Sequence, residues 1–363
     1  MPVFFYAHFE GGGAYECAQI KLIQRGNRRQ NGSQYKKNRK SIRKEPSESQ
    51  KKGGVYLSTT IIAVDHGYGN IKTVHEIFPS GIIPCADEPT FARDKLYWAG
   101  HWYIIGEGHK EFTDDKAGDE DYLLLTMVAM AKELKLLGKT EAEVHLAVGL
   151  PLTWVGEQKD KFRTYFLRIP VLDYNYNSID YHVELTDVSV YAQGFAYAIT
   201  CIRDFTGTNM LCDIGNGTMS SMFINDCRAV SGKIFMDKLG TYQCVLAIQE
   251  ALMKTCHLSV EESIIEQALR CETAHLSPRV LEVINSTASE YAETIMRRLR
   301  EHGYNPELVK LHLMGGGACI IRNFGKMDSS NVSFNMDIHA TAKGYQYLAE
   351  QELRTGGVSI EKG

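Results

Sequence analysis

A short segment near residue 65 combines a carboxylate, glycines and a lysine at a spacing that suits polyphosphate binding. The pattern is Asp65-x-Gly67-x-Gly69-x-x-Lys72, and it follows the apolar, β-branched run at residues 56–64. Glycines let a backbone hairpin approach a polyphosphate and point its N–H groups toward it, while the lysine supplies a positive charge. The aspartate can hold a hydrated divalent cation. The segment has two interpretations, a phosphate-binding turn after a strand and an ordinary surface β-turn.

Two further glycine turns make the phosphate interpretation specific. Asp213-x-Gly215-x-Gly217-Thr218 follows the apolar run 210–212, and Gly315-Gly316-Gly317 follows a predicted strand at 309–313. The first segment is not a P-loop, and Lys72 stands where a dinucleotide-binding fingerprint needs its third glycine. Each turn alone is a weak signal. Three coincident strand–glycine turns in this order are hard to explain as ordinary loops.

The elements that must position these turns alternate between strands and helices, as in an α/β protein. Two strand–glycine hairpins of one kind, about 150 residues apart, imply two similar α/β domains that face each other. In the helix at 279–301 the predicted apolar stripe is Val283, Thr287, Tyr291 and Ile295. The spacing predicts strands at 56–64, 144–148, 181–190 and 219–224, a hairpin at 96–105, and helices at 119–137, 192–203, 241–255, 260–270, 279–301 and 338–353.

Length and composition narrow the class of protein. At 363 residues the chain exceeds what one hydrophobic core usually supports, so we expect two domains. No apolar run approaches the roughly 18 residues of a membrane span, and the order of apolar and basic residues at the start is the reverse of a secretory signal. The nine cysteines include no C-x-x-C pair, which indicates neither a disulfide framework nor a thiolate zinc site. We expect a cytoplasmic protein that does not contact membranes.

The first 54 residues differ in charge from the rest. They hold twelve Lys/Arg against four Glu, a net charge of +8, so the remainder carries −12 of the total of −4. This composition predicts a disordered arm. It is either a nucleic-acid-binding tail or a stretch outside the native protein. We favour the second interpretation, because Lys51-Lys52-Gly53-Gly54-Val55 is what a translated ribosome-binding site would encode, with Leu57 at the start codon.

The three glycine turns resemble those of the actin-like ATPase superfamily, which also contains sugar kinases and heat-shock chaperone ATPases. Their order matches the first phosphate loop, the second phosphate loop and the adenosine loop of that superfamily. The finer resemblance, over residues 57–354, is to ParM/StbA-type plasmid segregation actins of Gram-positive bacteria. It rests on Tyr97-Trp98-Ala99-Gly100, the segment 103–108, the run Asp119-Glu120-Asp121-Tyr122-Leu123-Leu124-Leu125-Thr126, and Ala147-Val148-Gly149-Leu150-Pro151-Leu152-Thr153.

The resemblance implies a fold and a domain division. It predicts two RNase H-like α/β domains of the actin, chaperone-ATPase and sugar-kinase type, with a nucleotide cleft between them. The first domain is expected at residues 55–204 together with a closing helix at 337–354, and the second at 205–336.

Roles for single residues also follow from the resemblance. Lys72 would contact the β- and γ-phosphates, and Asp65 and Asp213 would hold Mg²⁺ through water. Asp213 and Gln193 are the catalytic candidates, since Gln193 stands where the family has the residue that orients the attacking water; a solvent-exposed glutamine at a helix start is the local alternative. The residues expected to line the nucleotide are Asp65, Gly67, Tyr68, Gly69, Asn70 and Lys72 in the first loop, Gly215, Asn216, Gly217 and Thr218 in the second, and Gly315, Gly316 and Gly317 beneath the adenine.

The implied activity is hydrolysis of ATP, or of GTP in its place, with Mg²⁺. Hydrolysis would be coupled to polymerisation and disassembly of a filament that segregates plasmid DNA. The implied partners are further copies of the chain and a DNA-binding adaptor protein on a centromere-like plasmid repeat, without direct sequence-specific DNA binding by the chain. The alternative is a small-molecule kinase for a sugar or acid, which would need a carboxylate base that the sequence does not display. A non-enzymatic DNA-binding protein would rest on the basic arm alone.

Overall fold

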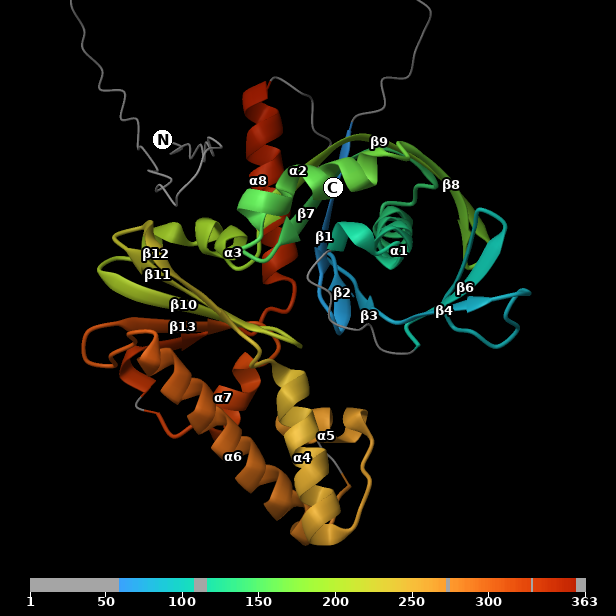
Figure 1. Ribbon diagram of the computed structural model, residues 1–363. Coiled ribbons are helices and arrows are strands. Elements are labelled where there is room, and N and C mark those ends of the chain that lie inside the picture. The colour runs from blue at the N-terminus through green and yellow to red at the C-terminus, as the bar shows by residue number, and fades with distance from the viewer. Residues whose placement is uncertain (1–58, 108–115, 272–274, 328, 357–363) are drawn as a thin grey trace, which may run out of the picture. The chain divides into compact units, whose positions relative to one another are not determined.

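The computed structural model describes residues 59–107, 116–271, 275–327 and 329–356, which form two β-sheets and their surrounding helices (Figure 1). The basic arm at 1–54 and the start of the first predicted strand at 56–58 lie outside the described residues. Within the described ranges, no helix is long and apolar enough to cross a membrane.

The first sheet has nine strands in the order β3-β2-β1-β7-β9-β8-β5-β6-β4. Its centre is parallel, because β1 pairs with β7 and β7 pairs with β9 in parallel, while β2 runs antiparallel to β1. The bounds are β1 Thr60–His66, β2 Asn70–Lys72, β3 Ile77–Pro79, β4 Ile82–Cys85, β5 Lys95–Trp98, β6 His101–Ile105, β7 Glu141–Leu150, β8 Val171–Tyr176 and β9 Ile179–Ala192.

The second sheet repeats the central pattern of the first. Its order is β12-β11-β10-β13-β14, with β10 antiparallel to β11, and with β10, β13 and β14 parallel. The hairpin of β10 and β11 therefore corresponds to that of β1 and β2, and each is followed by parallel strands. The bounds are β10 Thr208–Ile214, β11 Met219–Asn225, β12 Arg228–Asp237, β13 Lys310–Met314 and β14 Val332–Phe334.

The helices cover both sheets. From the first to the last they are α1 Asp121–Leu136, α2 Val155–Leu167, α3 Phe195–Thr200, α4 Thr241–Cys256, α5 Glu262–Leu269, α6 Pro278–Glu301, α7 Ala318–Phe324 and α8 Ala340–Gly356, with single 3-10 turns at Lys116–Gly118, Ile202–Asp204 and Ser329–Asn331. The last helix, α8, contacts β1, β7 and α3 although it is far from them in sequence (Figure 1).

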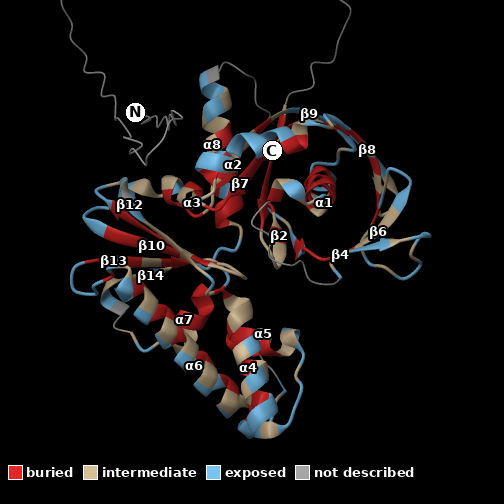
Figure 2. Ribbon diagram, in the orientation of Figure 1, coloured by how far each residue is buried: buried red, intermediate tan, exposed pale blue. Residues whose placement is uncertain are grey.

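Alternation along β10 explains why helices pack on both faces of the second sheet. Met210, Cys212 and Ile214 belong to the core shared with α4, α5, α6 and α7, whereas Leu211 belongs to a separate core with Ala198 of α3. Successive side chains of a strand point to opposite faces, so one apolar run supplies both cores. Figure 2 shows the resulting burial along β7 and β10, each in the interior of its sheet.

The predicted α/β class with two sheets of similar plan is confirmed, as is the hairpin at 96–105. The first sheet ends at Ala192 and the second begins at Thr208. The domain boundaries at 204 and 336 stay a prediction.

Two predicted details are wrong. The helix expected at 192–203 is preceded by a longer strand, because β9 continues to Ala192 and α3 begins only at Phe195, after Gly194 at φ +72°. In α6 the buried face lies one residue away from most of the predicted stripe and includes Ile284, Ala288, Ala292, Ile295 and Leu299. The two alanines of that face, Ala288 and Ala292, are fully buried, and α6 packs against α4, α5 and α7.

We predict that Gly149→Ala lowers the thermal stability of the chain. A Cβ at Gly149 would lie 1.9 Å from the hydroxyl oxygen of Tyr345, whose side chain is fully buried on α8. Overpacking of this kind costs about 1–3 kcal/mol, so the midpoint of thermal unfolding measured by circular dichroism falls by several degrees. The matched control is Gly156→Ala in α2, where a Cβ meets no atom within 4 Å and the midpoint stays or rises. Equal midpoints for the two variants would contradict the close approach of α8.

Candidate nucleotide-binding site

Asp65 is the centre of a small polar cluster at the end of β1. Its carboxylate is buried, with Oδ2 3.7 Å from Lys72 Nζ. The side-chain amide of Gln193 donates to Oδ1 at 2.9 Å. Asp65 and Lys72 face each other across the β1–β2 ladder, and Gln193 follows the end of β9. The structure thus brings together three residues that the sequence placed up to 128 positions apart.

The first glycine turn joins β1 to β2 and requires glycine at two places. A Cβ on Gly67 would lie 2.6 Å from the carbonyl oxygen of Asn70 in the same turn. A Cβ on Gly69 would lie 2.5 Å from the side-chain nitrogen of Asn216, in the second turn. Tyr68 packs its ring against Gly217 at 3.6 Å from the position of a Cβ there. The two glycine turns are therefore in direct contact.

The second glycine turn also fixes the start of α4. Gly215 donates its N–H to the carbonyl of Thr218, which closes the turn. The first N–H groups of α4, from Thr241 and Tyr242, donate to the carbonyls of Gly215 and Asn216 at 3.0 and 2.9 Å. The loop thereby satisfies helix N–H groups that have no partner within the helix.

The third glycine cluster lies against the carboxylate of Asp213. A Cβ on Gly315, which has φ +81°, would lie 2.4 Å from Asp213 Oδ1, and one on Gly317 would lie 2.3 Å from the side chain of Ile214. Gly316 is exposed and has open space around it. Burial raises the pKa of the Asp213 carboxyl to about 6, opposed by the positive charge of Lys72 and reinforced by the negative charge of Asp65.

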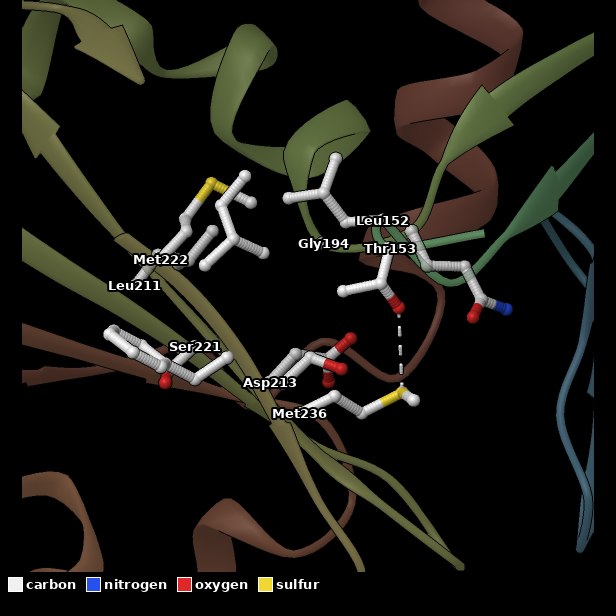
Figure 3. Close-up of a pocket in the computed structure, with 12 residues that line it drawn as sticks. Leu152, Thr153, Gly194, Leu211, Asp213, Ser221, Met222 and Met236 are labelled. Carbon is white, nitrogen blue, oxygen red and sulfur yellow. Dashed lines mark hydrogen bonds between the residues drawn. The ribbon is translucent and has the colours of Figure 1, made fainter. Parts of the chain in front are cut away.

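A pocket beside Asp213 links the two sheets. Figure 3 shows Leu152, Thr153 and Gly194 on one side and the side chains of Leu211, Met222 and Met236 on the other. The Thr153 hydroxyl contacts the Met236 sulfur at 4.0 Å. Gln193 and Asp213 both line this pocket, so the two catalytic candidates face a common space.

Two carboxylates without a third ligand suit a metal ion that keeps part of its water shell. Asp65 and Asp213 are close enough for the charge of one to raise the pKa of the other. Mg²⁺ retains several waters and is held by one or two carboxylates together with phosphate oxygens. The described part of the chain has no group of three or more His, Cys, Asp or Glu residues that could hold a metal by themselves. The residues therefore fit a hydrated Mg²⁺ bound together with a phosphate ligand.

Comparison with known proteins identifies the fold of the chain. Residues 63–195, which contain Asp65, Lys72 and Gln193, match the family model described as actin like proteins N terminal domain. The archaeal actin homolog Ta0583 superposes with a TM-score of 0.67 at 19% identity, covering 80% of this chain and 99% of that one. This chain has the actin-like fold. The predicted fold and the predicted resemblance to actin-like proteins are confirmed.

Two more solved structures with the actin-like fold are similar to the chain. The Alp12 filament structure has a TM-score of 0.59 at 15% identity and covers 81% of this chain and 99% of its own. ParM of Bacillus thuringiensis with ATP has a TM-score of 0.58 at 15% identity and covers 80% of this chain and 98% of its own. A search of curated proteins found no match.

Two buried residues beside the candidate site carry no signal in the sequence. Tyr345 of α8 is fully buried beneath Gly149, and the charges of Asp65 and Asp213 add to the rise in the pKa of its hydroxyl that burial causes. Lys116 is 1% exposed and donates to the carbonyl of His66, the last residue of β1 before the first glycine turn. Both residues come from elements distant in sequence, so only the folded chain brings them to the site.

We predict that Asp213→Asn stabilises the metal-free chain at high pH. The pKa of Asp213 is raised above its ordinary 3.8, so its charged form is disfavoured by folding. The cost is fully present above about pH 6 and absent below the ordinary pKa. In EDTA, the free energy of unfolding of Asp213→Asn should exceed that of wild type by about 1–3 kcal/mol at pH 8, and the difference should shrink toward pH 4. Exposed Asp87→Asn is the control. A variant less stable than wild type at pH 8 would contradict this burial.

Proposed function

We propose that this chain is an actin-like ATPase that polymerises with bound ATP, hydrolyses it and disassembles, and that the filament segregates plasmid DNA. The observation that carries the proposal is the meeting of two glycine turns, one from each sheet, each preceded by an aspartate at a strand end. Gly69 approaches Asn216 and Tyr68 packs on Gly217, and Asp65 and Asp213 are close enough for the charge of one to raise the pKa of the other. The resemblance of the sequence to ParM/StbA-type actins and the solved ParM with ATP support it.

The side chains of the site suit hydrolysis of a nucleoside triphosphate. Lys72 offers a positive charge for the β- and γ-phosphates, and the backbone N–H groups of both turns offer further donors. Bound Mg²⁺ would neutralise charge on the phosphates. Gln193, already held by Asp65, would orient a water for attack on the γ-phosphorus. The bond from the γ-phosphorus to the bridging oxygen then breaks, which yields a diphosphate and inorganic phosphate.

Contribution of both sheets to one site offers a physical reason for nucleotide-dependent assembly. A triphosphate that contacts both glycine turns favours the arrangement of the two sheets that it bridges. Hydrolysis removes one of the bridging groups, so the arrangement that suits a filament loses stabilisation. The partners we propose are further copies of the chain and a DNA-binding adaptor on a centromere-like plasmid repeat. The solved Alp12 filament supports self-assembly of a chain with this fold.

We predict that Lys72→Ala abolishes ATP-dependent polymerisation. The variant removes the lysine beside Asp65, so binding of the phosphates weakens by tenfold or more. Light scattering after addition of ATP and Mg²⁺ should rise for wild type and stay flat for Lys72→Ala. Lys95→Ala is the matched control, since the two lysine side chains are 21% and 20% exposed and each pairs with one carboxylate. Polymer that forms equally in EDTA without nucleotide would contradict the proposal.

We predict that Gln193→Ala separates hydrolysis from binding. A residue that only orients water contributes little to the affinity of the ground-state nucleotide, so its loss lowers turnover by about 10²–10³-fold and leaves affinity nearly intact. The variant should polymerise, and its filaments should outlive those of wild type. The measurement is a paired time course of phosphate release and light scattering.

The outcome of that time course also separates the ATPase from a small-molecule kinase. Wild type should release phosphate with ATP and Mg²⁺ alone, whereas a kinase would need a sugar or acid as acceptor. Phosphate release by Gln193→Ala at the wild-type rate would show that another group orients the water.

A further inference from the structure

A lysine that belongs to neither glycine turn is buried beneath the first of them. Lys116 lies in the 3-10 turn Lys116–Gly118 ahead of α1, and its side chain is almost fully enclosed. Its ammonium donates to the carbonyl of His66 at 2.7 Å. The same ammonium lies 5.5 Å from the ring centre of Tyr68 and 5.6 Å from that of Tyr122. Lysines are rarely buried to this extent, because removal of an ammonium from water is costly.

The contacts of Lys116 fall on both sides of Gly67 in the first glycine turn. His66 precedes Gly67, and its imidazole is held on the other side by the hydroxyl of Thr126 at 2.7 Å. Tyr68 follows Gly67 and packs against Gly217 of the second turn. A single ammonium thus contacts the two residues that flank Gly67, and one of them also contacts the opposite glycine turn.

The charge of Lys116 also acts on the polar cluster of the site. Burial lowers the pKa of Lys116 to about 8, against the opposing effect of Asp65 and with the added repulsion of Lys72. Lys116 is therefore electrostatically coupled to both charged residues of the first turn. A purely structural role would be served as well by an apolar side chain of the same length, without the cost of burying a charge.

We propose that Lys116 is a positioning residue of the nucleotide site, which holds the first glycine turn in its binding shape from the inner side and adds a second fixed positive charge beneath the phosphates. The inference rests on the proposed function, because it assigns Lys116 to the same triphosphate. It accounts for a buried ammonium whose described hydrogen bond goes to the carbonyl of His66, directly before the first glycine turn.

The test compares two lysine variants of the full chain. Lys116→Met removes the charge and keeps the length of the side chain. Lys132→Met is the control, because Lys132 of α1 also lies over two aromatic rings, those of Phe78 and Tyr176 at 5.5 and 5.6 Å, and pairs with Asp94. Affinity for a fluorescent ATP analogue with Mg²⁺ should fall at least tenfold, about 1.4 kcal/mol, for Lys116→Met and less than twofold for Lys132→Met.

Thermal unfolding separates positioning from support of the fold. Without nucleotide, the midpoint for Lys116→Met should stay within about 3 °C of wild type, and the rise caused by saturating ATP in wild type should be largely lost. A lowered midpoint with a full rise on ATP would overturn the proposal, as would affinity within twofold of wild type.

Two further outcomes are decisive. If Lys116→Met does not fold, Lys116→Gln, which keeps a donor for the His66 carbonyl, is measured by the same criteria, and failure of both to fold would overturn the proposal because the fold itself would then require Lys116. A wild-type chain that binds no nucleotide would contradict the proposed function. A wild type that binds, with a Lys116→Met variant that binds equally well, contradicts the role of Lys116 alone.

Discussion

The buried carboxylate of Asp65 is the constraint on which the rest of the site depends. It sits at the end of a central strand, where burial of a lone negative charge is unfavourable unless other groups compensate for it. Lys72 offers the compensating charge across the β1–β2 ladder, and Gln193 donates from the end of β9. These three side chains hold the first glycine turn, β1 and the turn after β9 in one arrangement. A phosphate site at this cluster would therefore be held in place by the strands of the sheet.

The site also requires that backbone segments of the three turns approach one another closely. This close approach explains why glycines occupy these positions. Gly69, Gly315 and Gly317 each lie where a Cβ would overlap a neighbouring group at 2.5 Å or less. The neighbours belong to the second turn and to the end of β10, so the glycines allow the three turns to converge. Substitution would separate the turns as well as strain one of them.

Much of the fold and part of the site could be predicted from the sequence. The three glycine turns could be predicted from their residue types. Helix α1 could be predicted from its periodicity, and the hairpin of β5 and β6 from its central glycine. The buried face of α6 lies one residue away from most of the predicted stripe. Its alanines, Ala288 and Ala292, contribute little to an apolar sequence pattern although both are buried. Gln193 was expected at a helix start. Instead, β9 continues to Ala192, and Gln193 lies directly after it, where its side-chain amide donates to Asp65. Lys116 could not be found, since nothing in its neighbours indicates burial under a turn 50 positions earlier.

We propose that the two glycine turns bind one triphosphate between them. The most direct measurement is a crystal structure of the chain with a non-hydrolysable ATP analogue and Mn²⁺, which anomalous scattering locates in place of Mg²⁺. We expect phosphate density between Gly67–Gly69 and Gly215–Gly217, in contact with Lys72. We expect the metal to be linked through water to Asp65 and Asp213. Nucleotide bound elsewhere on the chain, or a metal away from both aspartates, would contradict it.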